Sequence, residues 1–140
     1  MSEDDKHAGN VILLRVACIT LLIALVLAWC LVATHAVKLP MALELFKNPD
    51  KLLSSHLDFL MMTMLLLGFY AAKVRLPAYV LWPMAIGSIG NPGLFLLEAI
   101  QSGPAGPPGP LMGIIIITSI TLTTFGYGMA AIKVFRSTLK

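Results

Sequence analysis

The chain has 140 residues, of which 58% are hydrophobic and only 12% are charged. A soluble domain has about a quarter of its residues charged, so lipid is the expected solvent for most of this surface. The length suits a single domain, residues 1–140, and leaves no room for a separate soluble catalytic domain. The net charge of +3 comes from scattered basic residues, which indicates a topology signal and excludes a nucleic-acid-binding surface.

Four long apolar stretches predict an all-α integral membrane protein, a four-helix transmembrane bundle that is expected to be oligomeric. A helix needs about 20 predominantly apolar residues to cross the hydrocarbon core of a bilayer. The stretches that meet this length are residues 11–34, 55–72, 76–100 and 111–132. The chain starts with acidic residues, whereas a secretory signal starts with basic ones, so the first span is expected to be retained.

Polar segments separate the spans. Residues 37–55 are expected to leave the membrane, with residues 41–46 forming a short helix at its interface. The third span contains Pro83 and the tripeptide Asn91-Pro92-Gly93, and because proline removes a backbone donor, this helix is expected to be broken and kinked. Residues 101–110, QSGPAGPPGP, predict a stiff extended loop before the last span.

Charge distribution predicts the orientation of the bundle. Four spans put both termini and the loop between the second and third spans on one side. The basic residues on that side are Lys6, Arg15, Lys73, Arg75, Lys133, Arg136 and Lys140. The other side has Lys38, Lys47 and Lys51, partly offset by Glu44 and Asp50. The positive-inside rule therefore predicts that both termini are cytoplasmic.

Polar residues of the spans gather toward the opposite, outer leaflet. They are His35, His56, Asp58, Asn91 and Glu98. The inner halves of the spans are almost purely apolar. Because polar groups inside a bilayer are costly and usually functional, the outer end of the bundle is the expected site.

Of these residues, His56 has the side chain best suited to bind a metal ion. Neutral imidazole binds iron or zinc, and a histidine that faces the interior of a membrane bundle is a common haem ligand. The position equally suits a histidine wetted by lipid head groups. A structural zinc site is less favoured, because no thiol or second histidine has the required spacing. His35 is a candidate second ligand, although its place at a helix end favours an interfacial role.

The other polar residues each have two interpretations. Asn91 precedes a proline, so it either caps the second half of a broken helix or donates its amide to a substrate oxygen. Asp58 suits the N-terminal turns of a helix, where the helix dipole favours an acid. Glu98 suits the head-group zone, and would serve as an acid or base if it lay deeper.

Two groups of side chains without charge are candidates for a pocket wall. The second span carries Met61, Met62 and Met64, which suit helix packing, lipid contact or one wall of a pocket for a flat cofactor. The third span has glycines every three residues, at Gly87, Gly90 and Gly93. Such glycines allow either two helices or a large ring to approach the backbone closely.

The order of several short motifs carries a family resemblance. The first span reads NVILLRVACITLLIALVLAWCLV, and the second opens with His56, followed by a Met-Met pair. An LGF tripeptide, residues 67–69, precedes a short basic loop, and an Asn-x-Gly motif, Asn91 to Gly93, lies in the third span before a Gly/Pro-rich loop. In this order and almost end to end, the chain resembles the styrene oxide isomerase family, small four-helix membrane enzymes of bacterial styrene breakdown.

The resemblance implies a homotrimer in a bacterial-type inner (plasma) membrane that binds haem b. It implies that His56 is the axial metal ligand and that Gly93 lies against the cofactor. In this family the ferric iron acts as a Lewis acid on an epoxide oxygen, and ring opening with a 1,2-shift gives an aldehyde. Asn91 is then the candidate catalytic residue that holds the oxygen of a small apolar substrate.

Three positions of the expected substrate pocket depart from the family. Phe95 replaces a tyrosine, Met62 replaces an asparagine and Gly87 replaces an aspartate. These departures favour a shared fold and a shared haem over a shared substrate. Two further functions therefore stay open. One is a haem protein without isomerase activity, such as a sensor, electron carrier or haem store, and the other is a cofactor-free structural membrane protein.

Overall fold

The computed structural model describes residues 10–101 and 109–139 of the chain, and in this part it contains helices and no strand. The long helices are α2 (Val11–Leu31), continued by the π-helical turn η1 (Val32–Ala36), α4 (Pro49–Ala71), α5 (Ala78–Ile100) and α6 (Pro110–Ser137). Each of the four is long and apolar enough to cross a membrane, which confirms the predicted all-α transmembrane bundle. The acidic start of the chain and most of the predicted extended loop, residues 102–108, lie outside the described residues.

The helices that carry the second and fourth expected spans are longer than those spans. α4 begins at Pro49, whereas the expected span begins at residue 55. Residues 37–55 are expected to leave the membrane, and the last of them form the first turns of α4, where Pro49 and the acidic Asp50 are both favourable at a helix N-terminus. α6 likewise continues past residue 132 to Ser137. The expected short helix at residues 41–46 is present as α3 (Pro40–Leu45).

The third span is one continuous helix, so the prediction of a broken helix is wrong. α5 runs from Ala78 to Ile100 with Pro83 and Pro92 inside it. Membrane helices tolerate proline where a neighbouring helix supplies hydrogen-bond partners to the backbone. The Ser55 hydroxyl of α4 donates to the carbonyl oxygen of Pro92 itself at 2.8 Å, so α4 contacts the backbone of α5 at this proline. The carbonyl that the missing Pro92 N–H leaves without its helical donor is that of Ser88, four residues earlier.

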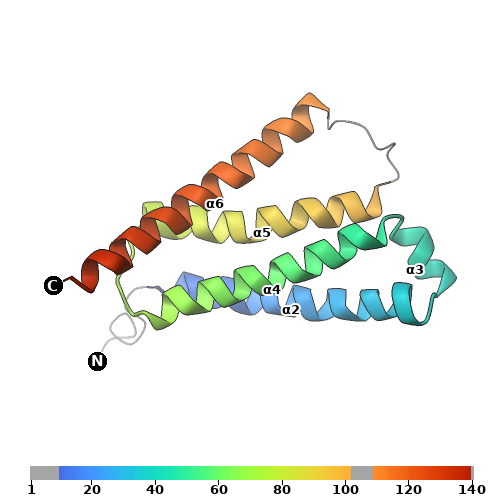
Figure 1. Cartoon of the computed structure of the whole chain (residues 1–140), viewed down its shortest axis with the longest axis horizontal. Helices are drawn as coiled ribbons and strands as arrows, with labels where there is room; N and C mark the ends of the chain where they lie inside the picture. Colours follow the sequence, from blue (N-terminus) through green and yellow to red (C-terminus); the bar gives the residue numbers. More distant parts are fainter. Residues whose placement is uncertain (1–9, 102–108, 140) are drawn as a thin grey trace.

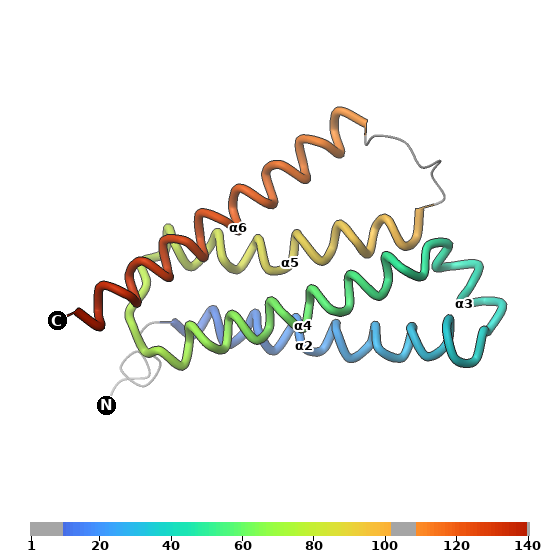
Figure 2. The backbone as a smooth tube through the Cα atoms, viewed as in Figure 1, coloured from blue at the N-terminus to red at the C-terminus, as the bar shows by residue number. Residues whose placement is uncertain are grey.

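The helices pack in the order α2, α4, α5 and α6. α2 packs mainly against α4, α4 also against α5, and α6 against α5 (Figure 1). The tube in Figure 2 shows α6 close to α5 near the end of the chain and diverging from it toward the start of α6. We call the end of the bundle with Asn10 and Ser137 the terminal end, and the opposite end the α3 end.

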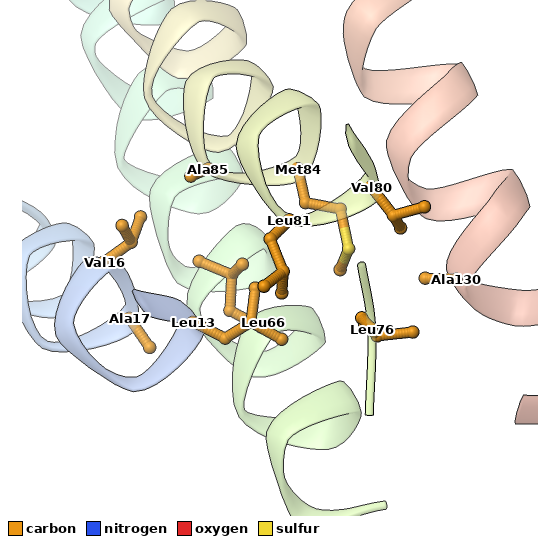
Figure 3. Packing of buried hydrophobic residues seen from close by; sticks show 10 residues of the cluster. All are labelled: Leu13, Val16, Ala17, Leu66, Leu76, Val80, Leu81, Met84, Ala85 and Ala130. Atoms are coloured by element: carbon orange, nitrogen blue, oxygen red, sulfur yellow. The ribbon is translucent and has the colours of Figure 1, made fainter. Parts of the chain in front are cut away.

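Buried apolar side chains form two clusters along the bundle. The cluster nearer the terminal end joins all four long helices (Figure 3), with Ala130 as its buried residue from α6. Its ten residues are Leu13, Val16, Ala17, Leu66, Leu76, Val80, Leu81, Met84, Ala85 and Ala130. The second cluster, nearer the α3 end, consists of Ala24, Leu27, Phe46, Leu52, Phe59 and Ala99. The described part of α6 contributes nothing to this second cluster, so α6 is the most peripheral helix.

Asn10 fixes the connection between α4 and α5 at the terminal end. Its Nδ2 donates to the Val74 carbonyl oxygen at 2.8 Å, and its Oδ1 accepts from the Leu76 N–H at 3.1 Å. The Asn10 side chain is fully buried. A buried amide must satisfy its donor and its acceptor, so these two bonds hold the start of α2 and the connection together.

Candidate functional site

His56 lies about two turns inside α4 and faces α2, not at the start of its helix as the sequence indicated. Its Nδ1 is 2.9 Å from the carbonyl oxygen of Ala24. Because a carbonyl oxygen only accepts, Nδ1 is the donor of this bond, and in the neutral ring this leaves the lone pair on Nε2. The ring is half-buried. This arrangement fixes the tautomer and leaves Nε2 as a potential metal ligand.

His35 is not positioned to share a metal with His56 in one chain. It is exposed at the end of η1, where its Nδ1 lies 3.1 Å from the hydroxyl of Thr34. Ala24, the partner of His56, is eleven residues earlier, which corresponds to about 16 Å along a helix. Within residues 10–101 and 109–139, no group of three or more His, Cys, Asp or Glu side chains could hold a metal ion.

Asn91 bridges α5 and α6. Its Nδ2 donates to Thr123 Oγ1 at 3.1 Å, and the Ser119 hydroxyl donates to its Oδ1 at 2.6 Å. Thr123 in turn donates to the Ser119 carbonyl oxygen at 2.8 Å. The side chain therefore does not cap a broken helix. An asparagine amide has two N–H donors and two acceptor lone pairs, so one of each stays available.

A second polar contact joins the same two helices. Ser88 Oγ and Tyr127 Oη are 2.6 Å apart. Ser88 donates its own hydrogen to the Met84 carbonyl oxygen, so the Tyr127 hydroxyl is the donor between the helices. We call the five side chains of these contacts the α5–α6 clamp: Ser88, Asn91, Ser119, Thr123 and Tyr127. Sequence reasoning missed four of them, although Ser119 and Thr123 have the i, i+4 spacing of one helix face.

Glycines allow α5 and α6 to approach closely enough for the clamp. A Cβ on Gly87 would lie 2.9 Å from Thr123 Cα, and one on Gly126 would lie 2.6 Å from the Met84 backbone nitrogen. A Cβ on Gly90 would lie 2.7 Å from the Ser119 hydroxyl oxygen. Gly87, named from the resemblance as a pocket residue, thus lies in a helix–helix contact.

The other residues that the resemblance assigns to the site are Met62, Gly93 and Phe95, and they lie elsewhere in the bundle. Met62 is buried in α4, whereas Gly93 has open space where a Cβ would lie. The Phe95 ring lies 5.4 Å from Lys51 Nζ, and the same ammonium group pairs with Glu98 at 2.7 Å. Both side chains of this pair are partly exposed.

The structure brings some of these candidates together and separates others. Asn91 and Gly87 meet at Thr123 of α6, and Asp58 is half-buried on α4 about 200° from His56 around the helix. His56 contacts α2, whereas Asn91 contacts α6, on the other side of α5 (Figure 1). One chain therefore presents these two side chains in different directions. No family model, no curated protein and no solved structure matches this chain.

Proposed function

We propose that this chain is a membrane haem protein in which His56 is the axial ligand of haem b, and that it isomerises an epoxide to an aldehyde. The observation that carries the proposal is the bond from His56 Nδ1 to the Ala24 carbonyl oxygen at 2.9 Å. Histidines that ligate a metal almost always donate their other ring N–H to a carbonyl or carboxylate, which fixes the tautomer and makes the ligand more basic. His56 has this arrangement already within one chain.

The surroundings of His56 suit a flat apolar cofactor. A single histidine is enough to hold a haem iron from the protein side, so a metal-binding cluster is not required. Leu53 and Leu60, three residues before and four residues after His56, share its face of α4. Leu53 and Leu57, the residue that follows His56, are exposed in the single chain. An apolar macrocycle would cover this surface while His56 holds its iron.

A site that uses both His56 and Asn91 takes them from different copies of the chain. Because His56 lies on the α2 side and Asn91 on the α6 side, a second copy is needed to bring the two groups together. This agrees with the homotrimer implied by the resemblance. The proposed site therefore lies between copies, within the bilayer, where a small apolar epoxide would arrive from the lipid.

The chemistry divides between the cofactor and the chain. When bound, haem would supply a Lewis acid that stabilises the developing negative charge on the epoxide oxygen. The chain would hold the cofactor through His56 and orient the substrate oxygen through the uncommitted amide hydrogen of Asn91. Apolar side chains of α4 would exclude water, which would otherwise attack the opened ring.

The proposal includes a location in the inner membrane with both termini in the cytoplasm. Among the described residues, Lys73, Arg75, Lys133 and Arg136 lie toward the terminal end. Lys38, Lys47 and Lys51 lie toward the α3 end, where Lys51 is paired with Glu98. The excess of basic residues at the terminal end supports this orientation.

The test combines a visible spectrum with a product assay. Wild type, His56→Ala and the matched control His35→Ala are purified from haem-replete cells and incubated with styrene oxide and aliphatic epoxides. We expect a Soret band and aldehyde from wild type and His35→Ala, and neither from His56→Ala. A Soret band that is unchanged in His56→Ala would contradict haem ligation by His56. A colourless wild-type protein would contradict the proposal as a whole and select a cofactor-free structural protein.

A haem protein without isomerase activity is the second candidate. It is favoured because Asn91 is already bonded to Ser119 and Thr123, and because Phe95 has no hydroxyl to offer a substrate. This candidate predicts a Soret band that responds to reduction and to added ligands, with no aldehyde from any epoxide.

Asn91 separates the two candidates. If the chain is an isomerase, Asn91→Leu lowers aldehyde formation while the Soret band persists. Ser88→Ala, which weakens the other contact of the α5–α6 clamp, serves as the control for a loosened helix pair. An equal loss of aldehyde in both variants would remove Asn91 from the proposed chemistry.

A further inference from the structure

A basic cleft lies at the terminal end of the bundle, far from His56 along the helices. It has a volume of about 300 Å³ and is lined by Val74, Arg75, Lys133, Arg136 and Ser137. The first two residues belong to the connection between α4 and α5, and the others to the last turns of α6. Three of the five lining side chains are cationic and none is acidic.

The cations of the cleft have no acidic partner in the described part of the chain. Arg75, Lys133 and Arg136 form no ion pair with residues 10–101 or 109–139. The described acids lie on the other half of the bundle, in α3, α4 and the end of α5. Like charges held together repel one another, so an anion that enters the cleft gains attraction from all three groups.

The backbone around the cleft is held in place before any ligand binds. Asn10 bonds to Val74 and to Leu76, the two residues that flank Arg75. On the other wall, Lys133, Arg136 and Ser137 have the i, i+3, i+4 spacing of one face of α6. A site with fixed walls loses less entropy on binding than one that has to be assembled.

The position along the membrane normal indicates the kind of anion. Lys133 follows the apolar part of α6, and long basic side chains at the ends of spans reach into the head-group zone. Phe135 and Tyr79 are exposed at this end of the bundle and would contact acyl chains. Basic pockets between transmembrane helices are known binding sites for anionic lipid head groups.

We propose that this cleft binds the phosphate group of an anionic phospholipid from the adjacent leaflet. Arg75 and Arg136 offer forked guanidinium donors to phosphate oxygens, and Lys133 adds a point charge. Ligand pockets range from about 300 to 1,000 Å³, so this cleft suits a head group while the acyl chains stay in the bilayer.

Lipid retention by the full chain, measured by native mass spectrometry from nanodiscs, tests the proposal. The probes are phosphatidylglycerol and phosphatidylcholine, and the variants are Arg75→Gln and Lys133→Gln. Removing one charge should lower the preference for phosphatidylglycerol about fivefold. The matched controls are Arg15→Gln, an exposed arginine of α2 outside the cleft lining, and Lys38→Gln at the α3 end. Both should keep the wild-type preference.

Three results would overturn the proposal. One is equal retention of the two lipids by wild type, and another is a loss in Arg15→Gln as large as the loss in Arg75→Gln. The third is displacement of phosphatidylglycerol by an equal concentration of soluble glycerol phosphate, which would assign the cleft to a free phosphate compound. Asn10→Ala keeps every charge, and we expect it to lower the preference because Arg75 is no longer held. An unchanged preference in Asn10→Ala would contradict the positioning role of Asn10.

Discussion

Two interfaces of the bundle, α2 with α4 and α5 with α6, both hold polar side chains within the membrane spans. Between α2 and α4, two threonines, Thr20 and Thr63, share a bond of 2.8 Å, and His56 contacts a backbone carbonyl. Between α5 and α6, the five side chains of the α5–α6 clamp bond to one another across glycines. The second interface is therefore richer in polar contacts between side chains.

The two interfaces differ in how their polar side chains are hydrogen-bonded. In the α5–α6 clamp, each of the five polar side chains has a hydrogen-bond partner on the other helix. This is expected where such bonds stabilise helix packing in lipid. In the α2–α4 interface, one ring nitrogen of His56 is bonded and the other is not. No buried side-chain nitrogen or oxygen of the described residues lacks a partner, so Nε2 of the half-buried His56 lies open at the surface of the single chain.

Of the substitutions that test this comparison, Gly126→Ala should cause the largest loss of stability. The new Cβ would meet the Met84 nitrogen at 2.6 Å and the Pro83 carbonyl carbon at 3.0 Å, and backbone atoms cannot rotate away. We expect a loss of about 1–3 kcal/mol in the free energy of unfolding, measured by denaturant titration in detergent micelles. The control is Gly128→Ala, which meets nothing within 4 Å and should lose no stability. Equal losses in both variants would show that α5 and α6 are not in close contact.

Asn91→Leu should have the next largest effect. It removes both bonds of Asn91 and leaves the hydroxyls of Ser119 and Thr123 without that partner. Interhelical hydrogen bonds in membrane proteins contribute at most about 1.7 kcal/mol each, so a loss near 1.5 kcal/mol is expected. A double-mutant cycle with Ser119→Ala measures the coupling directly. A coupling energy of zero would mean that Asn91 does not bind α6.

Tyr127→Phe should cost less, because it removes one bond to Ser88 and keeps the ring. The ring lies 5.8 Å from that of Phe69 on α4, and this contact survives the substitution. The expected loss is about 0.6 kcal/mol, the average for such a bond in a membrane protein. Tyr79→Phe, on an exposed tyrosine, is the matched control and should change nothing. A larger loss of stability in Tyr79→Phe than in Tyr127→Phe would contradict the hydrogen bond between Tyr127 and Ser88.

Thr20→Val in the α2–α4 interface should have the smallest effect. The Thr63 hydroxyl still donates to its own helix at the Phe59 carbonyl oxygen, so no donor is left without a partner. We expect the free energy of unfolding to fall by less than about 0.5 kcal/mol, measured by the same denaturant titration. A loss as large as that of Asn91→Leu would mean that the two interfaces do not differ in their dependence on hydrogen bonds.

The sequence predicted the spans well and the contacts poorly, for physical reasons. Apolar length alone determines which segments can cross a bilayer, so four helices were predictable. Helices that are apolar all round do not reveal which face meets a neighbour, so Asn91 could not be matched with Ser119 and Thr123. The early start of α4 was missed because its first turns are polar.

For His56 the residue type was evident from the sequence, but the orientation of its side chain was not. Its partner is the backbone carbonyl of Ala24, and a backbone acceptor leaves no mark in the sequence. The bond became predictable only once the packing of α2 on α4 was known. The contact between His56 Nδ1 and the Ala24 carbonyl oxygen, on which the haem proposal depends, therefore comes from the structure and not from the sequence.

The most direct test of the account is the visible spectrum of His56→Gly, purified from haem-replete cells, before and after addition of imidazole. If His56 is the axial ligand, the variant loses the wild-type Soret band, and imidazole restores it by occupying the space of the missing ring. The account is contradicted if His56→Gly shows the wild-type spectrum without imidazole, or if the wild type itself has no Soret band.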